Sequence, residues 1–449
     1  MPNPILPLWE YIPDGEPRVF GDRVYLYGSH DRPSGESFCD FKLKVWSADV
    51  NDLNHWVCHG DSFRTRPSSS GRPADTPWTD HSLFAPDVVE KDGKYYLYAY
   101  IVGSKGAVGV SDKPEGPFRL LSDYRYTREN GAAADAEVGD GGIFNDAGVL
   151  VDDDGRAYVY YGFERSWMNK LNADNMCEVL PGTLRGPAVD DAETVPAERR
   201  FYEASSPRKI NGRYYLIYSP RRGSRLAYAT SDSPRGPFTY RGYIIDNGVD
   251  YPGGNNHGSV ACINGQWYVF YHRMTNGTIM SRRACVEKIE ILPDGTIPTV
   301  EMTSLGFEDA LDPYQPTKAE LACVLTGGCY VTELDLFTRV VTGVTDGCVM
   351  GYKYFDFGFD GTGEPLTFAL KARGRGTPCR LHIRLDSPDG EDLGVCEIGA
   401  GDGIYRAKTA PVTGRHALYL VAEHRVEGWM GRFFEGKPLF ELEEFVFLK

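Results

Sequence analysis

Three carboxylate residues stand just before segments in which aromatic and aliphatic residues alternate. Asp14 lies in YIPDGEPRVF, Asp87 in SLFAPDVVEKDGKYYLY and Glu203 in FYEASSPRKINGRYYLIYS. Apolar or small neighbours disfavour the charged form of a carboxyl group and raise its pKa. A carboxyl group with a raised pKa can donate a proton at neutral pH, as a general acid must. Taken singly, each acid would be assigned to turn capping, but their shared placement indicates general acid–base chemistry.

The elements that position these acids form a repeat. One unit occurs five times, as FGDRVYLYGS (20–29), KDGKYYLYAY (91–100), DDGRAYVYYG (153–162), INGRYYLIYS (210–219) and INGQWYVFYH (263–272). Most copies begin with an Asp-Gly or Asn-Gly turn that leads into a strand of period two, which is a strong hairpin signal. The copies are roughly 50 to 70 residues apart, enough for one four-stranded sheet each, and no amphipathic helix interrupts them. We predict an all-β fold with a five-bladed β-propeller over residues 1–305.

The rest of the chain is also expected to be β-structure. Residues 306–324 are irregular and are predicted to be a linker. Residues 325–449 contain alternating runs such as CRLHIRLDSP and HALYLVAEH between Gly-rich turns, a pattern typical of an antiparallel β-sandwich.

Composition and charge limit the partners and the compartment. The 449 residues carry a net charge of −15, which argues against nucleic acid and anionic membranes as partners. The N-terminus shows no signal-peptide pattern and no stretch is apolar enough to span a membrane. The ten cysteines form no C-x-x-C pair, and several lie in apolar strand-like segments. We therefore expect a cytoplasmic protein with reduced thiols. The oligomeric state is not predicted.

Five segments, in order, resemble glycoside hydrolase family 43. They are PDGEPRVFGDRVYLYGSHD, LFAPDVV, DAGVLVDDDGRAYVYYG, YEASSPRKINGRYYLIYS and NNHGSV with GQWYVFYHR. The resemblance covers residues 10 to 305 and implies a five-bladed propeller that cleaves arabinosyl, xylosyl or galactosyl linkages by an inverting mechanism. Inversion requires two carboxyl groups roughly 6.5–9.5 Å apart, with room for a water molecule.

The resemblance also implies a role for each acid. Asp14 would be the general base that activates water, Asp87 would tune and orient the acid, and Glu203 would be the general acid. Many members of the family have Pro directly after the base, whereas Asp14 is followed by Gly15, Glu16 and Pro17. Glu16 is the competing residue, and Asp14 is preferred as the base.

Four further residues are candidates for substrate binding. The resemblance implies that His257, in PGGNNHGSV, contacts a hydrated calcium ion in the channel, directly or through water; the alternative is a structural histidine. Calcium itself prefers oxygen ligands. One of Arg282 and Arg283 is expected to point inward and bind sugar hydroxyls, with a surface or salt-bridge role as the alternative. Asp146 occupies the acid position of the third blade and is expected to contact substrate.

Aromatic residues ahead of Asp87 suggest one wall of a sugar site. Trp78 and Phe84 precede this acid on a long segment, where they could stack on a sugar ring or simply pack. The C-terminal part resembles a family 6 carbohydrate-binding module, chiefly through VTGRHALYLVAE and PLFELEEFVFLK. This part either binds carbohydrate or braces the propeller.

Three functional hypotheses follow. The first is an exo-acting inverting glycosidase that releases α-L-arabinofuranosyl or β-D-xylosyl residues from plant-derived oligosaccharides. The second is a β-galactosidase or galactofuranosidase of the same fold, because single residues in the pocket select the sugar. The third is a non-catalytic carbohydrate-binding propeller, against which the presence of three acids argues. No organic cofactor is expected.

Overall fold

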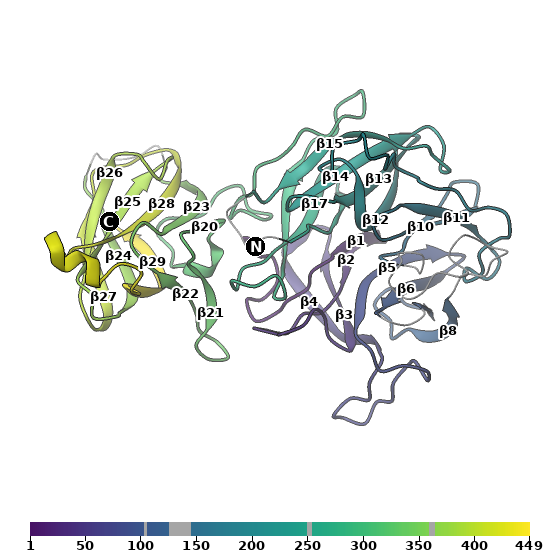
Figure 1. Cartoon of the computed structure of the whole chain (residues 1–449), viewed down its shortest axis with the longest axis horizontal. Helices are drawn as coiled ribbons and strands as arrows, with labels where there is room; N and C mark the ends of the chain where they lie inside the picture. The colour runs from purple at the N-terminus through teal and green to yellow at the C-terminus, as the bar shows by residue number, and fades with distance from the viewer. Residues whose placement is uncertain (103–105, 125–144, 249–253, 359–363) are drawn as a thin grey trace.

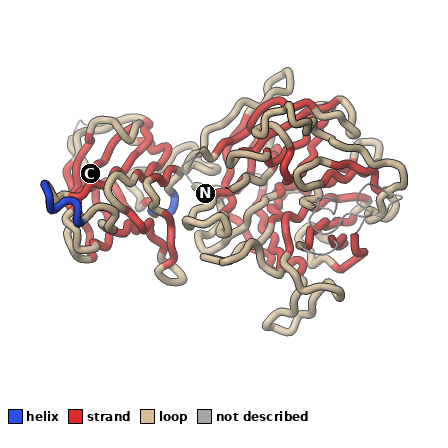
Figure 2. The backbone as a smooth tube through the Cα atoms, in the orientation of Figure 1, coloured by secondary structure: helices blue, strands red, loops and turns tan. Residues whose placement is uncertain are grey.

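The computed structural model describes residues 1–102, 106–124, 145–248, 254–358 and 364–449. It consists of two bodies, a larger one coloured purple to teal and a smaller one coloured green to yellow (Figure 1). Strands and loops make up almost all of both bodies (Figure 2). Within the described residues, no helix has the length and apolar character needed to cross a lipid bilayer.

The larger body contains five antiparallel sheets in chain order. The first has β1 (Glu16–Phe20), β2 (Arg23–Gly28), β3 (Lys42–Asp49) and β4 (Asp52–Arg64). The second has β5 (Leu83–Lys91), β6 (Lys94–Ile101), β7 (Gly106–Ser111) and β8 (Arg119–Tyr124). The third has β9 (Gly148–Val151), β10 (Ala157–Tyr161) and β11 (Trp167–Leu171).

The last two sheets complete the ring. The fourth has β12 (Phe201–Ile210), β13 (Arg213–Pro220), β14 (Arg225–Ser231) and β15 (Thr239–Asp246). The fifth has β16 (Ser259–Ile263), β17 (Gln266–Arg273) and β18 (Arg283–Ile289). The N-terminal segment closes the ring, because the Ile5 amide donates to the Ala284 carbonyl at 3.0 Å and Asn3 bonds to Val286. Contacts among β1, β5, β9 and β12 place the first strand of each blade at the centre. The predicted five-bladed propeller is confirmed.

The predicted tight turns join the first two strands of three blades. Asp92 and Gly93, Asn211 and Gly212, and Asn264 and Gly265 each form a two-residue connection. Both residues of every pair have positive φ, between 49° and 83°. This is the backbone of a type I′ turn, which matches the twist of the flanking strands and favours Asn or Asp followed by Gly.

The smaller body is a sandwich of two antiparallel sheets. One contains β19 (Thr317–Lys318), β21 (Tyr330–Glu333), β22 (Arg339–Val344), β24 (Thr367–Gly374), β27 (Asp402–Lys408) and β29 (Phe440–Leu448). The other contains β20 (Val324–Thr326), β23 (Val349–Asp356), β25 (Cys379–Leu385), β26 (Asp392–Ile398) and β28 (Arg415–His424). Two 3-10 helices, η2 (Ala319–Leu321) and η3 (Gly428–Phe433), accompany them. Because β19 pairs with β29, the sandwich begins within the segment predicted as a linker.

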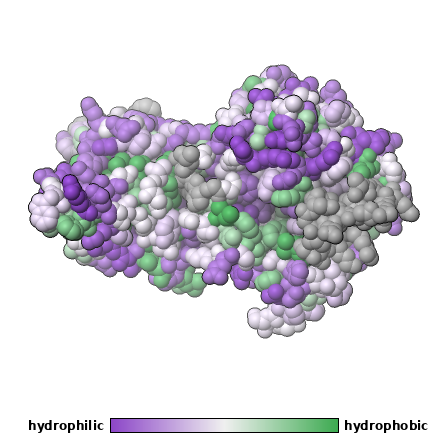
Figure 3. Space-filling view, viewed as in Figure 1, coloured by the Kyte–Doolittle hydropathy of each residue, from purple (hydrophilic) through white to green (hydrophobic). Residues whose placement is uncertain are grey.

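The two bodies are joined by apolar and polar contacts. One hydrophobic cluster runs from Ile217 and Val269 of the propeller to Leu321 and Phe445 of the sandwich. The Val331 amide donates to the Thr275 carbonyl at 2.9 Å. In the space-filling view, both bodies are largely hydrophilic and a hydrophobic area lies near the middle of the visible face (Figure 3). All ten cysteines are free thiols, and seven of them are buried.

Candidate active site

A cavity of about 400 Å³ is lined by residues from all five blades. Its lining comprises Asp14, Phe38, Phe84, Tyr100, Val102, Asn145, Asp146, Tyr202, Glu203, Gly254, Asn255, His257, Ile279 and Arg282. A larger hollow of about 660 Å³ lies against the sandwich, and its lining contains neither histidine nor arginine. Volume alone would favour the sandwich hollow. The propeller cavity is the candidate site because three carboxyl groups line it, those of the buried Asp14 and Asp146 and of the half-buried Glu203.

Backbone pairing shows which residues occupy equivalent places in the five blades. The first strand pairs with the second through Glu16–Tyr27, Asp87–Tyr98, Gly148–Tyr160, Ser206–Ile217 and Ser259–Phe270. In every blade the second residue of these pairs is the fifth residue after the turn. Two positions before the first residue stand Asp14, Ala85, Asp146, Ala204 and His257. Asp14, Asp146 and His257 are therefore equivalent, Glu203 lies one residue before that position, and Asp87 lies two residues after it.

The backbone at this shared position is unusual. Asp14, Ala85, Asp146 and Ala204 have φ values of 57°, 35°, 48° and 69°. Residues other than glycine rarely adopt positive φ, and such conformations concentrate at functional sites. Pairing with the second strand is also irregular here, between Phe84 and Asp87 and between Glu203 and Ser206. The bends redirect the chain at the mouth of the channel, so the simple alternation of a strand no longer decides where a side chain points.

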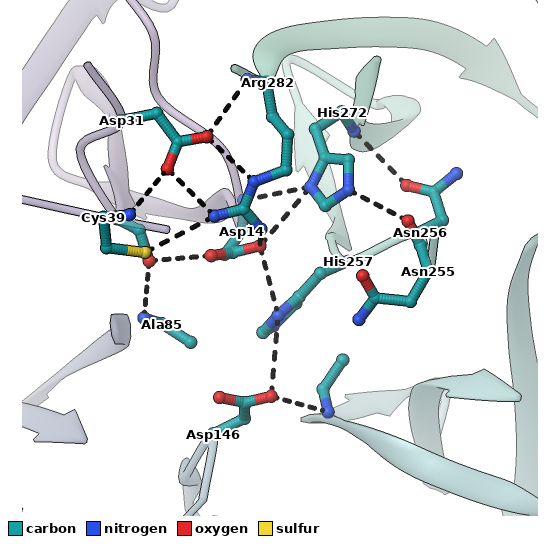
Figure 4. Close-up of polar contacts among 12 residues, drawn as sticks. Asp14, Asp31, Cys39, Ala85, Asp146, Asn255, Asn256, His257, His272 and Arg282 are labelled. Atoms are coloured by element: carbon teal, nitrogen blue, oxygen red, sulfur yellow. Dashed lines mark hydrogen bonds and ion pairs between the residues drawn. The ribbon is translucent and has the colours of Figure 1, made fainter. Parts of the chain in front are cut away.

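Asp14 is held in its charged form. Its Oδ1 accepts a hydrogen bond from Arg282 Nη1 at 2.7 Å, and its Oδ2 accepts one from Ser29 Oγ at 2.7 Å (Figure 4). The Asp14 amide donates to His272 Nδ1 at 3.4 Å. Burial opposes ionisation, but Arg282, His272 and His257 outweigh it and hold the pKa of Asp14 far below its usual range. Asp14 is an ionised carboxylate at neutral pH.

The pKa of Glu203 is shifted in the opposite direction, upwards. Burial of the Glu203 carboxyl group and the nearby charge of Asp14 raise the pKa of Glu203 to about 7. Its Oε2 accepts a hydrogen bond from Asn145 Nδ2 at 3.4 Å, and its Oε1 accepts one from Asn255 Nδ2. Glu203 therefore retains a proton at neutral pH in a substantial fraction of molecules, as a proton donor requires.

Asp146 lines the same cavity as these two groups. Burial, followed by the charges of Glu203 and Asp14, raises the pKa of Asp146 well above its usual range. Its Oδ2 accepts a hydrogen bond from the amide of Ala204, the residue after Glu203, at 3.1 Å. Asp146 thus fixes the backbone that carries Glu203, and the charge of Glu203 acts on Asp146.

His257 faces the carboxylates from the fifth blade. Its Nδ1 is 3.6 Å from Asp14 Oδ1 and 3.9 Å from Asp146 Oδ2 (Figure 4). Burial lowers the pKa of His257 to about 4, so the ring is neutral at pH 7. Among the residues that the structure describes, no three His, Cys, Asp or Glu side chains are arranged to hold a metal ion. This donor set does not fit a directly coordinated calcium ion, which takes 6–8 oxygen ligands.

Asp87, predicted to share the site with Asp14 and Glu203, does not line the cavity. Its carboxylate accepts two hydrogen bonds from Arg18 Nη2, at 2.8 and 2.7 Å, and one from the Val149 amide at 2.7 Å. The equivalent residue of the first blade, Glu16, bonds Arg208 at 2.7 Å in the same way. Asp87 and Glu16 thus form a layer of buried ion pairs between the inner strands of the blades.

The other predicted residues divide into two groups. Phe84 and Arg282 line the cavity. Trp78 lies outside it and packs against a hydrophobic cluster between the first two blades. Arg283 also lies outside the cavity, where it donates to Tyr11 Oη at 2.8 Å and covers the Tyr11 ring. The alternation of side chains along β18 sends two neighbouring arginines to different sides.

Several cavity residues were not predicted. Phe38, Tyr100, Asn145, Tyr202 and Asn255 line the cavity without a recognisable motif. The buried Asp31 lies behind the cavity and bonds Arg282 through both carboxylate oxygens. A usable signal for Asp31 exists, because it stands three residues after the end of β2, the first aromatic strand.

Comparisons with known proteins agree with this geometry. A family model described as "Glycosyl hydrolases family 43" matches residues 1–297. The chain is 38% identical to a xylosidase/arabinosidase of Thermoclostridium stercorarium over 404 residues, which cover 79% of this chain and 82% of that protein.

Two solved structures are informative. An arabinoxylan arabinofuranohydrolase from Bacillus subtilis, in complex with cellotetraose, covers 100% of this chain and 97% of its own, with 23% identity and a TM-score of 0.56. At this identity the match shows the fold alone. A beta-xylosidase/alpha-arabinofuranosidase from a compost metagenome, in complex with xylotriose and in a calcium-free form, is 28% identical with a TM-score of 0.54. That match covers 67% of this chain and 98% of the other.

Proposed function

Because this chain belongs to glycosyl hydrolase family 43 and is a glycoside hydrolase, we propose that its propeller cavity removes terminal α-L-arabinofuranosyl or β-D-xylosyl residues from plant-derived oligosaccharides with inversion. The observation that carries the proposal is the opposite displacement of two pKa values in one cavity. The pKa of Asp14 is lowered and that of Glu203 is raised to about 7. Two carboxyl groups with separated pKa values are the pattern of an acid and a base.

The reaction assigns one proton transfer to each group. Ionised Asp14 takes a proton from a water molecule, whose oxygen attacks the anomeric carbon. The bond from that carbon to the leaving oxygen breaks, and the leaving oxygen receives the proton of Glu203. One attack on the face opposite the leaving group inverts the anomeric configuration. Asp14 ends protonated and Glu203 ends ionised, and exchange with water restores both.

The remaining lining residues support this chemistry. Asp146, rather than Asp87, is proposed to tune and orient the acid, because Asp146 bonds the Ala204 amide beside Glu203. Arg282 keeps Asp14 ionised. Phe84, Phe38 and Tyr100 provide apolar rings in the wall, which suit the C–H face of a sugar.

An exo mode of action is supported by the names of the relatives. The chain is similar to proteins described as a xylosidase/arabinosidase and a beta-xylosidase.

We propose no directly coordinated calcium ion in this cavity. A related structure exists in a calcium-free form, but the described residues here offer His257 and the two reacting carboxylates rather than a separate ligand set. Any ion at His257 would be held through water.

The decisive experiment measures hydrolysis of the 4-nitrophenyl α-L-arabinofuranoside, β-D-xyloside, β-D-galactofuranoside and β-D-galactopyranoside. Wild type is compared with Glu203→Ala and Asp14→Ala, and NMR of the first product reports its anomeric configuration. We expect cleavage of one or both pentosides, inverted product and loss of activity in both variants. A retained configuration would make Asp14 a nucleophile. Cleavage of the galactosides alone would replace the proposed pentose substrate with galactose. Binding without cleavage would favour a non-catalytic carbohydrate-binding propeller.

A further inference from the structure

A second hollow, of about 580 Å³, lies next to the catalytic cavity. Its lining includes Phe163, Glu164, Arg165, Glu193, Arg200 and Arg221. The Phe163 ring packs on the Tyr202 ring with centroids 4.8 Å apart, and Tyr202 lines the catalytic cavity. This aromatic pair is therefore the wall that the two spaces share. We call the second space the outer hollow.

The outer hollow lies on the side of the general acid. Tyr202 directly precedes Glu203 on β12, and the charges of Glu203 and Glu164 both act on the Tyr202 hydroxyl. A general acid must reach the oxygen of the leaving group. The leaving group of the substrate must therefore lie beside Glu203, on the side where Tyr202 and the outer hollow are found.

The wall of the outer hollow is fixed to the strand that carries the acid. The Glu164 amide donates to the Tyr202 carbonyl at 2.6 Å. Arg221 Nη2 donates to the Glu164 carbonyl at 2.6 Å. The Gly162 amide donates to the carbonyl of Asn145, whose side chain bonds Glu203. These hydrogen bonds fix the turn after β10 relative to the reacting groups. The fixed geometry favours the interpretation of the hollow as a binding site.

The chemistry of this wall suits sugar hydroxyl groups. Phe163 is partly exposed and offers an apolar ring. Around it, three guanidinium groups supply hydrogen-bond donors and the carboxylates of Glu164, Asp191 and Glu193 supply acceptors. The three positive and three negative charges balance, and Arg165 lies 3.5 Å from Asp191. A balanced wall favours a neutral ligand over an anionic one.

We propose that the outer hollow binds neutral sugar units of the leaving group, with one ring stacked on Phe163 and hydroxyls bonded to Arg165 and Glu193. The proposal rests on the proposed function, because Glu203 as the acid defines the leaving side. The hollow would make the enzyme prefer oligosaccharides over glycosides with a small leaving group.

The test compares two substrates for each sugar. Wild type, Phe163→Ala and Arg165→Gln are assayed on xylotriose and 4-nitrophenyl β-D-xyloside, and on arabinosyl-xylotriose and 4-nitrophenyl α-L-arabinofuranoside. We expect kcat/KM for the oligosaccharide to fall roughly ten-fold more than kcat/KM for the aryl glycoside, which corresponds to about 1.4 kcal/mol of lost contact. Phe337→Ala, an exposed phenylalanine of the sandwich, is the matched control.

Three results would overturn the proposal. Equal losses on both substrates would mean that Phe163 only supports Tyr202 and Glu203. Unchanged kinetics on the oligosaccharides in folded variants would mean that the hollow stays empty. If wild type cleaves nothing, the proposed function fails, and calorimetry with xylotriose then tests the hollow separately. Phe163→Ala must weaken the binding of xylotriose. An unchanged affinity in this variant, or no detectable binding by wild type, would refute the site.

Discussion

Arg282 donates a hydrogen bond to Asp14 at 2.7 Å while its Nε and Nη2 bond the two oxygens of Asp31, at 2.9 and 3.0 Å. All three side chains are buried. Asp31 therefore fixes the guanidinium that keeps Asp14 ionised, although Asp31 does not line the cavity. The low pKa of the proposed base depends on this chain of three residues.

Replacement of Asp31 tests this chain. In Asp31→Asn, Arg282 loses a charged anchor and holds Asp14 less well, so the pKa of Asp14 should rise. We expect kcat to fall about 10- to 100-fold and the acidic limb of the kcat/KM profile to move to higher pH. The measurement is a pH–rate profile. A loss of stability with an unmoved acidic limb would assign Asp31 a purely structural role.

The dependence of activity on the leaving group distinguishes the proposed acid from the proposed base. Glu203→Ala should lose about 10²- to 10⁴-fold in kcat on glycosides with a poor leaving group, but much less on 2,4-dinitrophenyl glycosides, which need no protonation. Asp14→Ala should lose activity on both, because attack by water is impaired. Steady-state kinetics on the two substrate types, with azide added as a replacement nucleophile, make the comparison. Equal sensitivity of both variants to the leaving group would contradict the assignment.

The raised pKa of Glu203 predicts the basic limb of activity. Activity should fall as pH rises through about 7, because Glu203 loses the proton that it donates. The check is kcat/KM between pH 4 and 10 on an unactivated substrate. A basic limb that persists in Glu203→Gln with the same midpoint would point to another group.

The same shift has a consequence for stability. The pKa of Glu203 rises from 4.5 to about 7 on folding, so the native state binds more protons between these values. The free energy of unfolding should therefore fall as pH rises through this interval. Glu203→Gln removes the charge and should be more stable than wild type at pH 8, by on the order of 3 kcal/mol. Denaturant unfolding at pH 4 and pH 8 measures the difference in the free energy of unfolding between the variant and wild type. The same difference at both pH values would refute the prediction.

Asp87 and Asp146 should behave differently when their charge is removed. Asp87→Asn leaves Arg18 buried without its charged partner and should destabilise the fold by about 3–5 kcal/mol. Asp146→Asn should mainly lower kcat, because Asp146 bonds the Ala204 amide beside Glu203. It should also move the basic limb to lower pH, because the two carboxyl groups repel each other when both are charged. Unfolding curves and pH profiles of both variants distinguish the roles. A shifted basic limb in Asp87→Asn would support Asp87 as the group that tunes the acid.

Removal of metal ions tests the calcium proposal. The described residues provide no separate ligand set around His257, so an ion held only through water should bind weakly. We expect dialysis against a chelator to change kcat/KM less than about three-fold, since calcium affinity follows the number and charge of its direct ligands. Activity with and without added Ca²⁺ is the readout. A large loss that Ca²⁺ restores and Mg²⁺ does not would establish a calcium site.

The sequence alone determined the architecture and six residues of the cavity. Asp-Gly and Asn-Gly turns followed by alternating aromatic residues have few structural solutions, so they identified the inner hairpins of the blades. Asp14, Phe84, Asp146, Glu203, His257 and Arg282 were all predicted, and all line one cavity. Placement before the aromatic strands was enough to find all of them except Arg282, which follows the fifth hairpin, because the first strands of all blades meet at the channel.

Only the tertiary structure decided which acids meet and how they ionise. Asp87 lies two residues after the left-handed position of its strand, at Ala85, whereas Glu203 lies one residue before that of its own strand, at Ala204. Similar sequence around Asp87 and Glu203 therefore leads to different environments. The separation of pKa values arises from Arg282, which lies 268 residues from Asp14 in the chain. Burial and charge depend on contacts between distant segments, and a local pattern of residues contains no record of those distances.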